Sequence, residues 1–249
     1  MPYSDRLRAN QLLAGLPLDD YAHLSPHMEA VPMPLGEVLA EPGHPMRYAY
    51  FPTTAIVSLL NVMQDGGTTE VAVVGYEGMI GVSLFMGGES TSSRAVVHSA
   101  GHGFRLKAQV LKDEFTHGGH MQQLLLRYTQ ALLTQMAQTA VCNRHHTLDQ
   151  QLARWLLLNL DRLHANTLEM TQELIAHILG VRREGITCAA GKLQKAGLIE
   201  YHRGHITVLD RPGLEACACE CYAAVRAEYH RLLSMPPERQ PGGRLSVSR

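Results

Sequence analysis

The clearest alternation of apolar and polar positions in this chain lies between residues 171 and 208. It begins with an apolar stripe at the spacing of a buried helical face, formed by Leu174, Ile175, Ile178 and Leu179. Thr171 can cap this helix at its start. Gly180 can end it, because glycine enters a left-handed conformation at least cost. A second amphipathic helix is expected over residues 183–196, with an inner stripe of Ile186, Ala189, Ala190 and Leu193.

The period changes from helical to extended after this second helix. Four apolar or aromatic residues then alternate with polar ones: Ile199, Tyr201, Ile206 and Val208. Arg203-Gly204 separates the two halves of this pattern, and glycine supplies the positive φ that a hairpin turn needs. The order helix, turn, helix, hairpin is that of a winged helix-turn-helix, which holds the start of its second helix in a DNA major groove.

The side chains that this arrangement leaves exposed have DNA-binding chemistry. The predicted DNA-binding residues are Arg182, Arg183, Glu184, Thr187, Lys192, His202, Arg203 and His205. Arginine can pair in a bidentate fashion with guanine, and glutamate can accept from a cytosine amine. Lys192, Lys195 and the wing cations are expected to meet phosphates. Cys188 could face either the groove or the core. The alternative is that the helix-turn-helix is an inert packing unit with a solvated basic face.

The first part of the chain is rich in short strands. The strand-like runs are residues 55–60, 69–74, 79–85, 95–99 and 104–106. Turns are expected at Asp65-Gly66-Gly67, at Gly87-Gly88 and at Gly101-His102-Gly103. Short helices are expected over residues 10–28, and one or two helical turns over 108–115. Strands at this spacing predict an antiparallel barrel or jelly roll.

A long helical stretch connects the two patterns. From Met121 onward, apolar and small residues follow alternating steps of three and four, which is the seam of a coiled-coil-like pair. The predicted dimer-interface residues are Leu125, Tyr128, Leu132, Gln135, Thr139 and Cys142. Burial of this helix within one subunit is the alternative. A further helix is expected over residues 148–164, with Trp155 as its core anchor.

Composition narrows the function without identifying it. The chain of 249 residues has room for two modest domains and a connector, and its formal net charge of −1 gives no global basic signal. Any nucleic-acid contact therefore depends on a local patch. No signal peptide or membrane span is visible, so we expect a cytoplasmic protein with no membrane partner. No phosphate-binding loop, nucleophile elbow or metalloprotease motif is present in the sequence, so we expect that the protein is not an enzyme.

The winged segment resembles the C-terminal domain of the Crp/Fnr superfamily of bacterial transcription regulators. The family's base-reading Arg-Glu pair maps onto Arg183 and Glu184, whereas Arg182 stands where family members usually have a capping Ser or Thr. The strand-rich part resembles the cyclic-nucleotide-binding roll of the same family. The resemblance implies a homodimer on a palindromic operator, with half-sites roughly one DNA turn (~34 Å) apart. The resemblance also implies RNA polymerase as a further partner.

The nucleotide pocket of the family is degenerate in this sequence. Gly81 is followed by Val82 where the family has the ribose-binding Glu, and Arg94 is followed by Ala95 in place of a hydroxyl residue. The effector is therefore expected to be an unidentified small molecule other than cyclic AMP. Its expected lining residues are Tyr76, Glu77, Gly81 and Arg94, with His98 beside them. An empty roll that serves as a scaffold is the alternative.

The cysteines and histidines predict no metal site and no cofactor. Cys217, Cys219 and Cys221 fall within one expected helix, where residues two apart point to different sides, so they cannot converge on a metal without outside ligands. No cysteine precedes Cys142, which argues against the N-terminal iron–sulfur cluster of the family's oxygen-sensing branch. A redox-active thiol and haem sensing stay open, and no axial haem ligand can be named.

The sequence therefore predicts an α+β protein: an N-terminal antiparallel β-roll of the jelly-roll type, a long dimerisation helix and a C-terminal winged helix-turn-helix. The expected bounds are 1–118 for the roll, 119–146 for the helix, 147–235 for the winged domain and 236–249 for a disordered tail. The predicted function is sequence-specific, homodimeric transcription regulation of the Crp/Fnr type. The alternative is a ligand-sensing or protein-interaction module whose winged domain does not read DNA.

Overall fold

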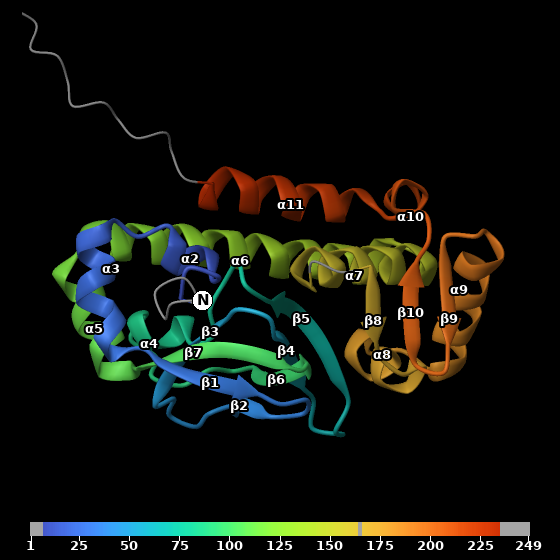
Figure 1. Ribbon diagram of the computed structural model, residues 1–249. Helices are drawn as coiled ribbons and strands as arrows, with labels where there is room; N and C mark the ends of the chain where they lie inside the picture. The colour runs from blue at the N-terminus through green and yellow to red at the C-terminus, as the bar shows by residue number, and fades with distance from the viewer. Residues whose placement is uncertain (1–6, 164–165, 235–249) are drawn as a thin grey trace, which may run out of the picture.

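The computed structural model describes residues 7–163 and 166–234. A β-roll occupies the first part of the chain, a long helix runs along one side of it, and a smaller winged domain lies at the far end of that helix (Figure 1). The predicted α+β fold class, with a roll, a long helix and a winged helix-turn-helix in this order, is confirmed. The predictions for the first six residues and for the tail lie outside the described residues.

Two antiparallel sheets form the roll. One has the order β1-β7-β3, from Glu29–Met33, Gly101–Lys107 and Tyr48–Pro52. The other has the order β2-β6-β4-β5, from Val38–Ala40, Arg94–Ser99, Ile56–Val62 and Thr68–Val74. The expected short helices precede the strands as α2 (Gln11–Ala14), α3 (Leu18–Leu24) and the 3-10 turn η1 (Ser25–His27). Helix α5 (Ala108–His117) leads out of the roll.

Two sequence-based predictions within the roll are wrong. The run 79–85 is not a strand, because Gly81 takes a φ of 111° and the chain turns there into the short helix α4 (Val82–Phe85). Gly101-His102-Gly103 is not a turn, because it belongs to β7. These glycines serve close packing: a Cβ would lie 2.4 Å from the Ala55 nitrogen at Gly101 and 2.7 Å from the Met33 sulfur at Gly103.

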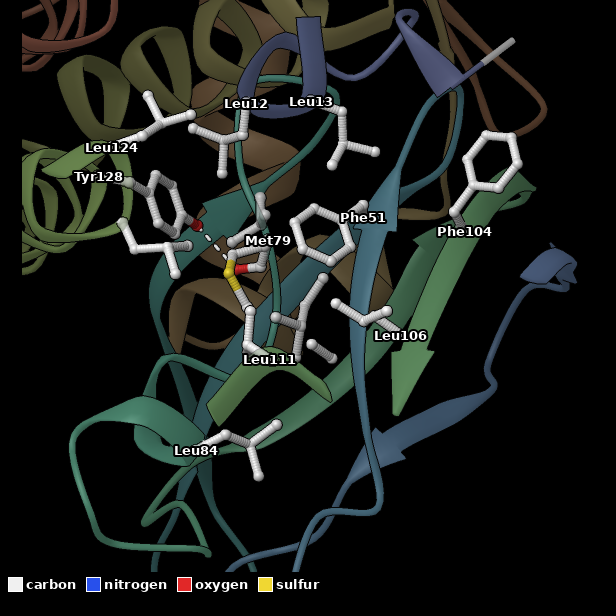
Figure 2. Close-up of a cluster of buried hydrophobic side chains, with 14 of the residues drawn as sticks. Leu12, Leu13, Phe51, Met79, Leu84, Phe104, Leu106, Leu111, Leu124 and Tyr128 are labelled. Atoms are coloured by element: carbon white, nitrogen blue, oxygen red, sulfur yellow. Dashed lines mark hydrogen bonds between the residues drawn. The ribbon is translucent and has the colours of Figure 1, made fainter. Parts of the chain in front are cut away.

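The core of the roll is sealed by the long helix α6 (Gly119–His145). Figure 2 shows Phe51, Leu106 and Leu111 gathered around Met79, with Tyr128 entering the same cluster from α6. The Tyr128 hydroxyl donates to the Met79 carbonyl oxygen at 2.9 Å, so this buried phenol is satisfied inside the core. Gly78 allows that approach, since a Cβ there would lie 2.5 Å from the Tyr128 oxygen.

Two further helices extend this layer toward the winged domain. Helix α7 (Leu148–Leu163) follows α6, and helix α11 (Glu220–Leu233) runs back alongside α6 (Figure 1). Trp155 of α7 is buried, as predicted for a core anchor. Among the described residues, no helix combines the length and apolar character that crossing a bilayer requires.

The face of α6 assigned from sequence to the dimer interface is turned into its own subunit. Leu125, Tyr128, Leu132, Gln135, Thr139 and Cys142 are all buried in the single chain. The roll and α11 cover them; Gln135, for example, donates to the Val73 carbonyl at 3.1 Å and to the Tyr229 hydroxyl at 3.1 Å. These side chains are therefore not available to a second subunit in this conformation, and the expected seam is an intramolecular one.

The winged domain begins with α7 and continues with short elements. They are β8 (Thr167–Glu169), α8 (Gln172–Leu179), α9 (Arg183–Lys195), β9 (Ile199–His202), β10 (His205–Val208) and α10 (Arg211–Cys217). Its sheet has the order β8-β10-β9, and the strand β8 was not predicted. A core continuous with Trp155 holds these elements together.

Candidate nucleic-acid interface

The helix-turn-helix forms as its sequence predicts. The Leu174 N–H donates to the Thr171 hydroxyl at 3.2 Å, which caps α8. Gly180 ends α8 with a φ of 67°. Arg182 then precedes α9 in extended conformation without a side-chain cap, and the Gly185 N–H donates to the Arg182 carbonyl at 3.0 Å. Among the described residues, the Arg183 and Glu184 N–H groups make no such bond and stay open to an anion.

The predicted DNA-binding side chains all lie on the surface, while the predicted inner stripe of α9 is buried. Within the described ranges 7–163 and 166–234, Arg182 and Glu184 form no ion pair, and Arg183 only approaches Glu173, at 4.0 Å. Arg182, Arg183 and Glu184 therefore stand at the start of α9 with their polar groups exposed.

Two of the predicted DNA-binding side chains, Lys192 and Thr187, form hydrogen bonds to other side chains of the chain. The Lys192 ammonium lies 2.7 Å from an Asp149 carboxylate oxygen on α7, which raises the pKa of Lys192. The Thr187 hydroxyl donates to the Gln172 side-chain oxygen at 2.6 Å. Both bonds are at the surface, where such pairs contribute little to stability, so DNA could compete for these groups.

Hydrogen bonds hold the wing, formed by β9, β10 and the turn between them, against α9. Arg203 and Gly204 both take positive φ, 49° and 85°, which is the geometry of a two-residue type I′ turn. The Tyr201 N–H donates to the Gln194 side-chain oxygen of α9 at 3.0 Å, and the Tyr201 hydroxyl donates to the Met170 carbonyl at 2.7 Å. These bonds place the exposed wing residues His202, Arg203 and His205 in fixed relation to α9.

The outward face of α9 contains a residue that the sequence-based set omits. Opposite the buried stripe lie Glu184, Cys188, Gly191 and Lys195, at steps of four, three and four. Cys188, whose side the sequence left open, is thus exposed. Gly191 lies within this face, and a Cβ added there would meet nothing within 4 Å. Internal packing does not require glycine at this position, whereas close approach of another molecule would.

The turn between α8 and α9 rests on the roll. The Thr68 hydroxyl of β5 donates to the His177 carbonyl of α8 at 2.9 Å. A Cβ at Gly180 would lie 2.5 Å from the Thr69 hydroxyl oxygen, so glycine is needed here for contact as well as for its φ. The winged domain is thus held against the sheet of the roll in one orientation.

The residues predicted for one effector pocket are divided among separate pockets, with Tyr76 and Glu77 in one and Arg94 and His98 in another. Tyr76 and Glu77 lie beside α7 and α11, where the Arg162 guanidinium lies 2.6 Å from the Glu77 carboxylate. Arg94 pairs with Glu41 at 2.9 Å, and His98 is buried in contact with Asn159. The single pocket assigned to these residues is therefore wrong.

Gly81 alone of that set lines a cavity between the roll and α6. The cavity has a volume of about 140 Å³ and is bounded by apolar side chains such as Met46, Leu59, Leu132 and Met136. Its few polar lining groups are hydroxyls, and among the described residues no charged side chain lines it. A cyclic phosphate would lack a cation there.

Comparisons with known proteins agree with this architecture. A family model described as a Crp-like helix-turn-helix domain matches residues 150–217. The protein has the Crp/Fnr fold. No curated protein sequence matches the chain significantly.

Similar solved structures extend the likeness over the roll and the long helix. A regulator of the Crp/Fnr family from Eubacterium rectale is 19% identical, with a TM-score of 0.62 over 83% of this chain and 96% of its own. FixK2 from Bradyrhizobium japonicum is 17% identical, with a TM-score of 0.65 over 77% of this chain and 98% of its own. The c-di-GMP-responsive regulator CLP from Xanthomonas campestris is 15% identical, with a TM-score of 0.62 over 77% of this chain and 99% of its own.

Proposed function

We propose that this protein is a sequence-specific DNA-binding transcription regulator of the Crp/Fnr type. The observation that carries the proposal is the start of α9, where the exposed side chains of Arg182, Arg183 and Glu184 surround a helix N-terminus that has no side-chain cap. Arginine and glutamate at the entrance of a recognition helix supply both a bidentate guanine contact and a cytosine acceptor. The cationic wing, bonded to α9 through Tyr201, supplies phosphate contacts at a fixed distance from the bases.

The regulator acts in this proposal as a homodimer. The interface lies on the outer face of α6, not on the face predicted from sequence. Leu126, Leu133 and Val141 are 52%, 59% and 45% exposed there, at steps of seven and eight residues. Large apolar side chains repeated on one exposed helix face are suited to pairing with a second copy. A two-fold axis along this ridge would present two α9 helices to a palindromic operator.

The proposed effector is a small, mostly apolar molecule and not cyclic AMP. The uncharged cavity supports this, and so does the sequence Gly81-Val82, which lacks the family's ribose-binding carboxylate. Leu132, Leu133 and Met136 of α6 line the cavity, and Leu133 also belongs to the outer ridge. A ligand in the cavity would therefore change α6 at the proposed dimer interface. That change would shift the two winged domains between spacings that fit DNA and spacings that do not.

The test is DNA selection from a random duplex library with the purified full chain. We expect recovery of a palindrome with half-sites roughly one helical turn (~34 Å) apart. Arg183→Ala and Glu184→Ala should each relax selection at particular bases, with a loss of about 1–3 kcal/mol per base contact. Arg47→Ala is the matched control, since Arg47 is an exposed arginine on the roll, and it should leave selection unchanged.

Unchanged selection in the Arg183 and Glu184 variants would contradict direct readout by α9. Absence of any selected motif would favour the alternative module whose winged domain does not read DNA. Repeating the selection with cyclic AMP tests the effector proposal, because an altered motif or affinity would contradict it.

A further inference from the structure

Four soft metal-binding side chains meet where α6 ends and α11 begins. Cys142 lies near the end of α6, His146 follows its last residue, and Cys219 and Cys221 flank the start of α11. The Cys142 and Cys219 sulfurs are 3.5 Å apart, and the Cys221 sulfur is 3.7 Å from His146 Nδ1. All four donor atoms lie within 4.8 Å of one another.

A break in the C-terminal helix makes this convergence possible. Helix α10 ends at Cys217, and Ala218 and Cys219 are extended, with ψ of 157° and 165°. Helix α11 then starts at Glu220 and runs back alongside α6 (Figure 1). The sequence analysis predicted no metal site because it assumed that Cys217, Cys219 and Cys221 lie on one continuous helix. In the structure the outside ligands come from α6, and Cys217 stays apart, packed against the winged-domain core.

The spacing fits a single tetrahedral ion. Bonds of about 2.3 Å from a central zinc to each sulfur place two thiolates roughly 3.8 Å apart. The Cys142–Cys219 separation of 3.5 Å is close to that value and well beyond the ~2.05 Å of a disulfide. Three thiolates and one imidazole are also a common donor set for structural zinc.

The surroundings of the four donors support a ligand role. The His146 Nε2 lies 3.2 Å from a Glu220 carboxylate oxygen. A proton on Nε2 leaves the lone pair of Nδ1 directed at the sulfurs, and a carboxylate partner of this kind orients many metal-bound histidines. The Gln151 side chain donates to the His146 carbonyl at 2.9 Å and holds the end of α6 in place.

A buried cation, Arg154, can balance the charge of the metal-bound site. A divalent cation with three thiolates and a neutral imidazole has a net charge of −1. Burial raises the pKa of both Cys142 and Cys221, and the buried guanidinium of Arg154 acts on both in the opposite direction, which favours their thiolates. The Arg154 Nη2 donates to the Thr139 hydroxyl at 2.8 Å, and the same cation also acts on the Glu70 carboxyl.

We propose that Cys142, His146, Cys219 and Cys221 bind one thiophilic divalent cation, with zinc as the natural ion, in a closed four-coordinate site. Binding releases three protons, one from each thiol, and forms three metal–sulfur bonds and one metal–nitrogen bond. Because the protein supplies all four ligands, the site is structural and not catalytic. It fastens α11 to the end of α6, next to the junction where α6 passes into α7 of the winged domain.

A nucleophilic thiol is the competing explanation of the cluster. Reactive cysteines have a lowered pKa and partial exposure. Cys142, Cys219 and Cys221 are instead buried together, with Cys142 and Cys221 fully inaccessible. This burial disfavours rapid thiol chemistry.

The experiment measures zinc bound to the full chain, purified under reducing conditions and dialysed against metal-free buffer. We expect about one zinc per chain in the wild type and in the matched control Cys217→Ser, whose cysteine lies outside the cluster. Cys219→Ser should lose stoichiometric binding. Glu220→Gln should weaken zinc affinity by roughly 10-fold, as expected for removal of an orienting carboxylate.

A second readout does not depend on how the serine variant folds. Cobalt added to the metal-free wild type should give the intense visible bands of a tetrahedral thiolate complex. These bands should shift in energy in His146→Gln, in which water replaces the imidazole while the three thiolates stay. Several results would overturn the proposal: no zinc or cobalt binding by the wild type, equal binding by Cys219→Ser and Cys217→Ser, or a Cys142–Cys219 disulfide in the reduced preparation. None of these outcomes depends on DNA binding.

Discussion

The indole N–H of Trp155 donates to a Glu70 carboxylate oxygen at 3.0 Å, and this bond joins the first helix of the winged domain to the sheet of the roll. The other Glu70 oxygen lies 2.5 Å from the Ser58 hydroxyl, which in turn lies 2.5 Å from His98 Nδ1. His98 Nε2 contacts the Asn159 side-chain oxygen at 2.6 Å, which returns the chain of polar contacts to α7. All five side chains are buried, so the two domains share one satisfied polar network.

Replacing Glu70 with Gln should change how stability depends on pH. Burial raises the pKa of Glu70 from 4.5 to about 7, although its bonds to Ser58 and Trp155 and the cations of Arg154 and Arg162 lower it. The folded state therefore holds the proton more tightly than the unfolded chain does. Stabilisation by the protonated carboxyl is complete below about pH 4.5 and is lost as the pH rises through about 7. The free energy of unfolding in urea should fall by a few kcal/mol over this window, relative to Glu70→Gln.

His98 faces the same hydroxyl and produces the opposite slope. Burial lowers its pKa from 6.5 to about 4, so its contribution is lost as the pH falls from 6.5 toward 4. The wild type and Glu70→Gln both contain His98. Subtracting one curve of unfolding free energy against pH from the other therefore isolates the contribution of the Glu70 carboxyl. Parallel curves between pH 4.5 and about 7 would show that Glu70 titrates normally in the folded protein.

Gly180→Ala should destabilise the protein more than Gly197→Ala does. Both glycines follow a helix of the helix-turn-helix with positive φ, 67° and 74°, and alanine in that conformation costs about 1 kcal/mol. Only Gly180 also lies against Thr69, where a Cβ would be 2.5 Å from the hydroxyl oxygen. That clash should add roughly 1–3 kcal/mol. Chemical denaturation measures both losses, and equal losses would mean that the turn does not press on the roll in solution.

Gly191→Ala should separate stability from DNA binding. Alanine in a helix interior is favoured over glycine by roughly 0.5–1 kcal/mol, and an added Cβ at this position meets nothing within the chain. The unfolding free energy should therefore rise. If α9 lies close against DNA, affinity for the selected operator should fall, as fluorescence anisotropy can measure. A variant that is more stable and binds equally well would show that DNA does not approach α9 at this residue.

Charged residues on the outer ridge of α6 should dissociate the proposed dimer. Leu126→Glu and Leu133→Glu place carboxylates on the ridge that we assign to the second copy, and sedimentation should then show monomers at micromolar concentration. The control is Leu209→Glu, because Leu209 is 60% exposed but belongs to the winged domain. If dimers persist in both ridge variants, or if the wild type is monomeric, the outer face of α6 is not the dimer interface.

The helix-turn-helix could be predicted almost to the residue because its signals are local. Thr171, Gly180 and the Arg203-Gly204 turn act through backbone conformation within a few residues, and the structure has each in the expected role. Gly101 and Gly103 misled the prediction for the opposite reason. Their lack of a side chain serves contacts with residues that are distant in sequence, so they read as a turn although they lie inside a strand.

The face of α6 could not be read from periodicity alone. Heptad-like spacing shows that a helix has a buried side, but it does not say whether a second copy or the same chain covers that side. The return of α11 along α6 decided this, and the six residues predicted for the dimer interface are turned inward. The predicted effector residues failed similarly, because Tyr76 and Glu77 lie in a turn beside α7 and α11, whereas Arg94 lies in β6 and pairs with Glu41.

By itself the sequence determined the order of the domains, the helix that begins with Arg183 and Glu184, and the absence of the family's ribose-binding carboxylate after Gly81. Each of these follows from short-range patterns of residue type. Only the tertiary structure decided which side of α6 stays free, how Trp155 meets Glu70, and that Cys142 and His146 lie beside Cys219 and Cys221. Those relationships join residues up to 85 positions apart, and chain folding, not local propensity, sets such distances.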